Sequence, residues 1–223
     1  MSIYALSDLH LSFALDKPMN VFGELWDEHF IKIEKNWNKK VKKDDLVLIA
    51  GDISWALKLN EALPDLEFIH NLNGRKVLIK GNHDYWWPSI SKLNSLYDDM
   101  YFIQNTSYFY EGFTICGTRG WINIDEKEEK DAKIYNRELI RLKLSLESAK
   151  DYKKIVMMHY PPVTKISKAQ EFLNVLKEYN VEKVIYGHIH YDARNICING
   201  YYEGIEFICS SADIINFDPI RII

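Results

Sequence analysis

Short apolar runs alternate with longer stretches of helical periodicity along this chain. The clearest runs, rich in Val, Ile and Leu, cover residues 3–7, 46–50, 77–80, 155–158 and 184–186. Helical periodicity covers about residues 23–40, 60–72, 88–96, 127–150 and 168–179. Continuous apolar runs between helical stretches are typical of an α/β protein whose sheet is buried on both faces.

Two further segments contain strand-like runs that follow one another without a helix. They are residues 101–117 and 193–223, and residues 201–204 resemble the turn of a hairpin. This succession predicts a second, partly antiparallel sheet. The sequence shows no internal repeat, low-complexity tract or Pro/Ser-rich linker, so we expect residues 1–223 to form a single domain.

One of the predicted helices, at residues 127–150, is highly charged but keeps one apolar face. That face consists of Tyr135, Leu139, Leu142, Leu146 and Ala149, which follow one another at alternating steps of four and three residues. We expect it to pack into the core of the protein and not to bind a partner.

The composition suits a soluble globular protein with a sizeable core. The 223 residues are 47% hydrophobic and 27% charged. No apolar run is long enough to cross a bilayer, and residues 1–10 do not resemble a signal peptide. The three cysteines form no C-x-x-C pair, and the net charge of −4 disfavours a protein that coats nucleic acid. We therefore expect a cytoplasmic protein without a membrane partner.

Each of the five apolar runs leads directly into a polar cluster. In chain order the clusters are Asp8-Leu9-His10, Gly51-Asp52, Gly81-Asn82-His83-Asp84, His159 and Gly187-His188-Ile189-His190. Loops at the carboxyl ends of strands in an open α/β sheet converge on one crevice, so we expect these clusters to meet there. Alternate residues of an extended segment point to the same side, which lets a D-x-H or H-x-H loop supply two ligands.

Seven side chains in these clusters are of types that bind borderline divalent metals. They are Asp8, His10, Asp52, Asn82, His159, His188 and His190. A catalytic zinc usually takes three protein ligands and keeps one position open, so seven candidates predict two ions. Two divalent ions, offset by two carboxylates and a bridging hydroxide, would leave a net positive pocket that attracts phosphate. Such a pair also activates water for an in-line displacement.

The order D-x-H, G-D, G-N-H-D, H and G-H-x-H resembles the calcineurin-like metallophosphoesterase family, in its bacterial and phosphodiesterase-type branch. The motifs extend from Asp8 to His190, over most of the chain, and each follows a predicted strand. The resemblance implies an α/β fold with a mixed two-sheet β sandwich flanked by helices. It also implies a hydrolase of phosphodiesters or phosphomonoesters in which a metal-bridging hydroxide attacks phosphorus.

The resemblance also assigns roles to single residues. One ion would be bound by Asp8, His10 and His190, the other by Asn82, His159 and His188, and Asp52 would bridge the two. His83 would contact the reacting phosphate and protonate the leaving oxygen, and Asp84 would support its loop. Asn82 would contact the substrate as well. The ligand set suits manganese, iron, zinc or cobalt nearly equally.

The second motif departs from that of the protein Ser/Thr phosphatases in this superfamily, which extend it to G-D-x-x-D-R-G. Here residues 51–57 read Gly-Asp-Ile-Ser-Trp-Ala-Leu, without the second Asp and the Arg. A phosphoprotein phosphatase is therefore disfavoured, and we expect a phosphorylated small molecule as substrate.

Two alternatives use the same fold. A scaffold or interaction protein would be expected to have lost metal ligands, whereas no ligand position is lost here. A structure-selective nuclease would be expected to have a basic groove and an added capping domain, neither of which is evident in 223 residues. Nucleic acid is therefore not indicated as a partner.

Further residues near the motifs could contact the substrate. Aromatic residues crowd the motif loops, at Trp55, Tyr85, Trp86, Trp87, Tyr160 and Tyr191. They either stack on a base or cover an acyl chain of the substrate, or they pack the loops together. Arg119 and Arg194 are candidate phosphate contacts, since a guanidinium can bind an oxyanion with two hydrogen bonds, but both are equally suited to ordinary surface ion pairs.

Overall fold

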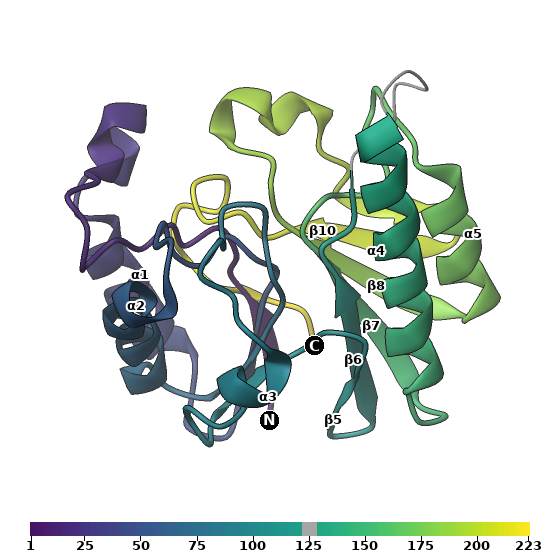
Figure 1. Cartoon of the computed structure of the whole chain (residues 1–223), viewed down its shortest axis with the longest axis horizontal. Helices are drawn as coiled ribbons and strands as arrows, with labels where there is room; N and C mark the ends of the chain where they lie inside the picture. The colour runs from purple at the N-terminus through teal and green to yellow at the C-terminus, as the bar shows by residue number, and fades with distance from the viewer. Residues whose placement is uncertain (122–128) are drawn as a thin grey trace.

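Two mixed sheets lie face to face, with helices on their outer sides, in the computed structural model of the chain (Figure 1). The structure describes residues 1–121 and 129–223. The first sheet has the strand order β11-β1-β2-β3-β4. Its strands are β1 (Ile3–Ala5), β2 (Leu46–Ile49), β3 (Arg75–Leu78), β4 (Met100–Phe102) and β11 (Ile220–Arg221). Strands β1 to β4 are parallel, and β11 runs antiparallel to β1.

The second sheet has the strand order β5-β6-β7-β8-β10-β9. Its strands are β5 (Tyr108–Tyr110), β6 (Phe113–Thr118), β7 (Lys153–Met158), β8 (Val181–Tyr186), β9 (Gly200–Tyr202) and β10 (Ile205–Cys209). Strands β6, β7, β8 and β10 are parallel, and the edge strands β5 and β9 are antiparallel to their neighbours. The fold class inferred from the family resemblance, a mixed two-sheet sandwich flanked by helices, is thus confirmed.

The membership of the two sheets differs from the simplest interpretation of the sequence. The five clearest predicted strands do not share one sheet, because β7 and β8 belong to the second. Strands β4 and β11 belong to the first sheet, although the sequence predicted that their residues form part of the second. An apolar run reports burial on both faces but does not show which neighbour a strand pairs with.

Helices cover the outer face of each sheet. Figure 1 shows α1 (His29–Lys40) and α2 (Leu59–Asn71) beside the first sheet, and α4 (Glu129–Glu147) and α5 (Gln170–Glu178) beside the second. The short α3 (Ile90–Leu93) contacts β4. Within the described residues, no helix combines the length and the apolar character needed to cross a bilayer.

Two predicted helices are shorter than expected, and a third lies partly outside the described residues. The stretch 23–40 is interrupted by positive φ angles at Gly23 (119°) and Glu28 (45°), so η2 (Glu24–Trp26) forms a separate 3-10 turn before α1. Only residues of α3 are α-helical within 88–96. The start of the predicted helix 127–150 falls among residues 122–128, outside the described part of the chain.

Successive side chains of a strand enter different apolar layers. In β2, Leu46 and Leu48 pack between the two sheets, whereas Val47 and Ile49 pack in the layer of α1 and α2. Strand β7 alternates in the same way between the central layer and the layer of α4 and α5. Because every position is buried, these strands read as continuous apolar runs in the sequence.

The apolar face predicted for the charged helix is confirmed. Tyr135, Leu142 and Leu146 on α4 are buried in the layer over the second sheet, and Leu139 and Ala149 pack against them. This face therefore belongs to the core.

Buried serines join the carboxyl ends of the two sheets. Ser7, after β1, donates its backbone N–H to the carbonyl of Ser210, after β10, at 2.8 Å, and its own carbonyl accepts the Ala212 N–H at 2.9 Å. The two serine hydroxyls are 2.7 Å apart. The Ser7 hydroxyl also accepts the N–H of Ala50, after β2, at 2.8 Å. These bonds fix the loops that follow three strands relative to one another.

A fully buried lysine completes the carboxyl end of α2. The Lys76 ammonium donates to the carbonyls of His70 (3.0 Å) and Leu72 (2.5 Å) and lies 2.6 Å from a carboxylate oxygen of Asp99. Burial lowers the pKa of Lys76, and the hydrogen bond with Asp99 raises it. The last carbonyls of a helix lack partners within the helix, so Lys76 supplies donors that α2 needs.

We expect Lys76→Met to lower the free energy of unfolding by about 2–3 kcal/mol, because it leaves two carbonyls without their donor and Asp99 with His70 as its remaining side-chain partner. Urea denaturation measures the change. Lys39→Met, which alters an exposed lysine of α1, is the matched control. A Lys76→Met protein within about 0.5 kcal/mol of the parent would show that the buried lysine does not stabilise the fold.

Candidate metal centre

The polar clusters that follow β1, β2, β3, β7 and β8 come together at the carboxyl edge of both sheets. Both carboxylate oxygens of Asp8 lie 3.1 Å from the backbone nitrogen of His188, which donates to them. The Asp52 carboxylate accepts the backbone N–H of His83 at 2.8 Å. Loops from distant parts of the sequence are therefore linked by direct hydrogen bonds.

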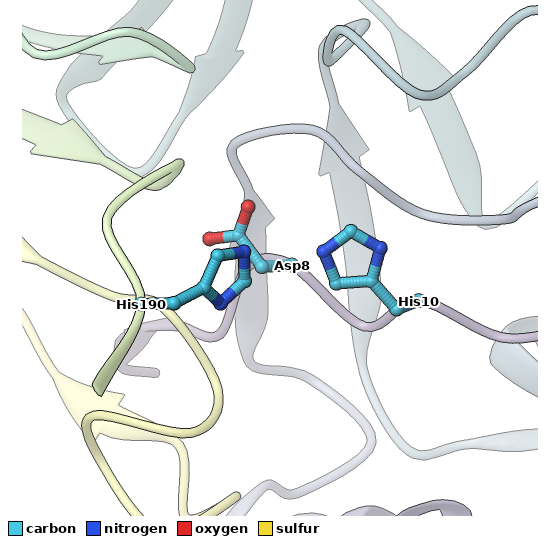
Figure 2. A group of neighbouring side chains, drawn as sticks. All are labelled: Asp8, His10 and His190. Carbon is cyan, nitrogen blue, oxygen red and sulfur yellow. The ribbon is translucent and has the colours of Figure 1, made fainter. Parts of the chain in front are cut away.

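Asp8, His10 and His190 form a first group that could hold a metal ion. One ligand atom from each residue lies within 4.8 Å of the other two. Asp8 and His10 are buried, and His190 is partly exposed. In Figure 2 the His190 ring lies next to the Asp8 carboxylate, and the His10 ring lies to the right of both.

A second group shares Asp8 with the first and adds Asp52 and His159. All three residues are buried, and their ligand atoms again lie within 4.8 Å of one another. The amide oxygen of Asn82 lies 2.6 Å from His159 Nε2 and 3.0 Å from His188 Nδ1. The two groups contain five of the seven predicted ligands, and Asn82 and His188 adjoin the second group through these contacts. The roles of all seven as ligands remain predictions.

Hydrogen bonds to the far side of the rings orient two of the histidines. His159 Nδ1 lies 3.0 Å from the carbonyl of Ala50, and His190 Nδ1 lies 3.2 Å from both oxygens of Asp213. Each ring donates a proton there, and in the neutral His159 this leaves the Nε2 lone pair for a metal. Burial lowers the pKa of His190, but the hydrogen bond with Asp213 and the charge of Asp8 outweigh it and raise this pKa to about 9. His159 Nε2 then faces the Asn82 oxygen, and two acceptors at that distance repel each other unless a cation binds both.

The charges of the centre also fit a pair of cations. Among the described residues, neither Asp8 nor Asp52 forms an ion pair with a lysine or arginine. Burial raises the pKa of both carboxyls. Burial lowers the pKa of His159 to about 3 and that of His188 to about 2, so these imidazoles are neutral, the form that binds a metal. The residues present therefore fit divalent ions.

One imidazole nitrogen of the centre has no partner. His10 Nδ1 is buried and forms no hydrogen bond within residues 1–121 and 129–223. The ring stacks on Trp55 with centroids 4.8 Å apart and an angle of 26° between the planes. Its other nitrogen lies 3.8 Å from the Asp52 carboxylate.

The backbone around the centre is strained. Asp8, His10, Asp52 and His188 have φ angles of 57°, 46°, 51° and 70°, in the left-handed region that side chains with a Cβ rarely adopt. Each such residue costs about 1 kcal/mol or more, and such strain clusters at functional sites. Here it turns the side chains of four candidate ligands toward one another.

Two glycines allow the backbone to pass directly behind the carboxylates. A Cβ at Gly187 would lie 2.5 Å from an oxygen of Asp8, and one at Gly81 would lie 2.1 Å from an oxygen of Asp52. Any larger residue at either position would displace a carboxylate of the centre.

Asp84 ties the loop after β3 to the loop after β2. Its buried carboxylate accepts the backbone N–H groups of Gly81 (2.7 Å), Ile53 (2.9 Å) and Ser54 (3.2 Å), and the indole N–H of Trp86 (3.1 Å). Burial raises the pKa of Asp84 to about 7. Asp84 thus supports its loop, as expected.

A cavity of about 840 Å³ opens beside the centre. His10, His83 and His190 form its polar wall. The rest of the lining is mostly apolar or aromatic and includes Met19, Val21, Phe22, Leu25, Trp26, Trp55 and Tyr191. His83 is half-buried and belongs to neither ligand group, and its ring centroid lies 4.3 Å from that of Trp55.

The aromatic residues divide between the two roles that the sequence left open. Trp86, Trp87 and Tyr160 are buried and pack the loops together. Trp55 and Tyr191 line the cavity instead, where a substrate could contact them.

Arg119 lies away from this cavity. One of its guanidinium nitrogens is 3.7 Å from Glu138 on α4, and its guanidinium carbon lies 4.6 Å from the ring centroid of Trp121. It lines a different cavity, of about 300 Å³. Its role as a phosphate contact therefore stays a prediction. Arg194 lies over the ring of Tyr191 at 3.8 Å.

Sequence reasoning missed Asp213, which is buried and orients His190 while accepting the N–H of Tyr191 at 2.8 Å. Asp213 follows the apolar run of β10, in the same pattern as the other clusters. The expectation of antiparallel pairing in this region hid the signal, because β10 is in fact parallel to β8 and ends at the same edge. Trp26 in the cavity wall was missed as well, because residues 23–40 were expected to form one helix.

Comparison with known proteins identifies the family. The family model described as calcineurin-like phosphoesterase matches residues 1–192, and the chain belongs to this family. The chain is similar to a probable cyclic nucleotide phosphodiesterase of Coxiella burnetii, with 28% identity over 66% of this chain and 61% of that protein. It is also similar to an uncharacterized protein of Methanocaldococcus jannaschii, with 37% identity over 37% of this chain and 46% of that protein. The matches therefore span less than two thirds of these relatives.

Solved structures show the same fold at low sequence identity. A protein of unknown function from Aquifex aeolicus superposes with a TM-score of 0.58 and 20% identity, over 99% of this chain and 95% of the other. A phosphopantetheinyl hydrolase from Mycobacterium tuberculosis superposes with a TM-score of 0.54 and 16% identity, over 92% and 87% of the two chains.

We expect Asp213→Asn to weaken binding of one metal ion by about tenfold or more, because His190 loses the charge that orients its ring. Competition with a chelator of known affinity measures the dissociation constants of manganese. Asp218→Asn, which alters a carboxylate in an exposed ion pair with Lys40, is the control. Unchanged manganese affinity in Asp213→Asn would show that His190 is not a ligand or does not need Asp213.

Proposed function

We propose that this chain hydrolyses phosphate esters of small molecules with two divalent metal ions, which could be manganese, iron, zinc or cobalt. The observation that carries the proposal is the convergence of Asp8, His10 and His190 with Asp8, Asp52 and His159 in a calcineurin-like phosphoesterase. Asn82 and His188 complete the proposed ligand set. When bound, such a pair of ions lowers the pKa of water and stabilises charge on the reacting phosphoryl group.

We assign the proton transfer to His83. Its imidazole lines the cavity, and its backbone is held by the Asp52 carboxylate at 2.8 Å. From this wall it donates a proton to the oxygen of the departing alcohol. The indole of Trp55 lies against both His83 and His10, so it helps to keep the two rings in place.

The cavity supports a substrate with a bulky apolar or aromatic part. Its volume of about 840 Å³ lies in the range of small-molecule sites, and Phe22, Trp26 and Trp55 provide flat apolar surfaces. The names of two similar proteins, a probable cyclic nucleotide phosphodiesterase and a phosphopantetheinyl hydrolase, agree with a small phosphorylated molecule. Glu24 and Asp192 in the wall add negative charge, which disfavours a nucleic-acid backbone.

Removing the metal should abolish hydrolysis, because the side chains of the centre alone provide no Lewis acid. We expect exhaustive dialysis against a chelator to stop turnover of nitrophenyl phosphate mono- and diesters, and added manganese to restore it. Metal content is measured alongside the rate. Full activity in protein shown to be free of metal would contradict the proposed function.

We expect His83→Ala to retain both metal ions but to slow hydrolysis of esters with poor alcohol leaving groups by about 10²–10⁴, the usual contribution of a general acid. Nitrophenyl esters should lose much less, because nitrophenolate leaves without a proton. His70→Ala, which alters a histidine of α2 that pairs with Asp99, is the control. An equal loss on both ester types would assign His83 to electrostatic stabilisation, and lost metal would make it a ligand.

A further inference from the structure

The second cavity, of about 300 Å³, shares no lining residue with the cavity at the metal centre. It lies where the ends of β3, β4 and β6 meet the side of α4. Its charged lining residues are Lys80, Arg119, Arg137, Glu138 and Arg141. Four cationic side chains therefore face one carboxylate, which leaves three positive charges in excess.

Glu138 is the centre of this cluster and is already fully engaged. Its buried carboxylate accepts from Arg141 at 2.9 Å, from Arg137 at 3.2 Å and from the hydroxyl of Thr118 at 2.9 Å, and it lies 3.7 Å from Arg119. One carboxylate balances one of the cations. The remaining positive charge is held together at a cost in Coulomb energy that a second anion would relieve.

Residues that line the same cavity carry hydrogen-bond donors without acceptors. Arg119 Nε and Trp87 Nε1 are both buried and have no partner in the described part of the chain. The Lys80 ammonium also has no hydrogen bond or ion pair there, and the carboxylate of Asp84, whose charge raises the pKa of Lys80, is occupied by backbone donors. A buried donor without an acceptor costs about 1–3 kcal/mol, so such donors are rare unless something binds them.

We propose that this cavity binds an oxyanion, such as a phosphate or sulfate group. The three unpartnered donors of Lys80, Trp87 and Arg119 offer an ammonium, an indole N–H and a guanidinium N–H, which are the groups that hold tetrahedral oxyanions. Arg137 and Arg141 add positive charge from α4. A doubly charged anion would offset two of the three excess positive charges of the cluster.

Tyr160 is one connection between the oxyanion site and the metal centre. The carbonyl of Arg119 accepts the backbone N–H of Tyr160 at 2.9 Å, and the Tyr160 ring lies 4.0 Å from the ring of His188. The anion is thus either a second anionic group of the substrate or a free ion that binds beside the centre.

Indole N–H signals report on the two sites separately. Trp87 lines the oxyanion cavity and Trp55 lines the cavity of the metal centre, and Trp87→Phe and Trp55→Phe assign their peaks in a proton–nitrogen NMR spectrum. We expect sodium sulfate, added to zinc-loaded protein at constant ionic strength, to shift the Trp87 peak until it saturates. Arg141→Gln should weaken this binding by about tenfold, the loss of one charge-assisted interaction.

Controls separate binding from folding. Lys92→Gln, an exposed residue of α3, should leave the affinity for sulfate unchanged. If Arg141→Gln lowers the thermal midpoint, Arg137→Gln, with a side chain that is 51% exposed, provides the same loss of charge at a more tolerant position.

Kinetic measurements decide the source of the anion. They rest on the proposed function, whereas the NMR titration is independent of it. If the anion belongs to the substrate, Arg141→Gln lowers kcat/KM for esters that carry a second phosphate and spares those with one. If it is a free ion, both ester types respond equally.

A Trp87 peak that stays fixed while the Trp55 peak moves would overturn the proposal, since sulfate would then bind at the metal centre alone. Affinities in Arg141→Gln and Arg137→Gln equal to that of the parent protein would overturn it as well.

Discussion

Two buried carboxylates, Asp8 and Asp52, lie where the carboxyl ends of both sheets meet, and no lysine or arginine within the described residues pairs with either. An unpaired buried charge is expensive, so this pair of carboxylates favours bound cations. Burial lowers the pKa of His159 and His188, whereas Asp213 and Asp8 raise the pKa of His190 to about 9, and the backbone is strained at four positions that turn candidate ligands inward. Most of the local geometry follows from this one requirement.

The sandwich makes that burial possible. Three apolar layers lie between and outside the sheets, and the bonds from Ser7 to Ser210 and Ala212 hold the two carboxyl edges in register. Candidate ligands from both sheets can then share one site: Asp8 and Asp52 follow strands of the first sheet, whereas His159 and His188 follow strands of the second. A change that separated the edges would separate the ligands.

The sequence was sufficient to predict the strands, the helical face of α4 and the polar clusters, because these depend on local periodicity and on the order of residues along the chain. It did not predict which sheet contains β7 or β4, since pairing depends on contacts between distant segments. Asp213 was missed for the same reason, because its importance follows from the parallel pairing of β10 with β8. The lining of the oxyanion cavity combines Arg119, Trp87 and residues of α4. No spacing in the sequence predicts that these residues lie together. The single domain and the ligand roles stay predictions.

The central claim is that this site holds two ions between the residues of both sheets. Anomalous X-ray scattering from crystals grown with manganese tests it directly. We expect two peaks about 3.5–4 Å apart, the usual separation of a two-metal site, on either side of Asp52. One peak should adjoin Asp8, His10 and His190, and the other Asn82, His159 and His188. A single peak, or none, at saturating manganese would contradict it.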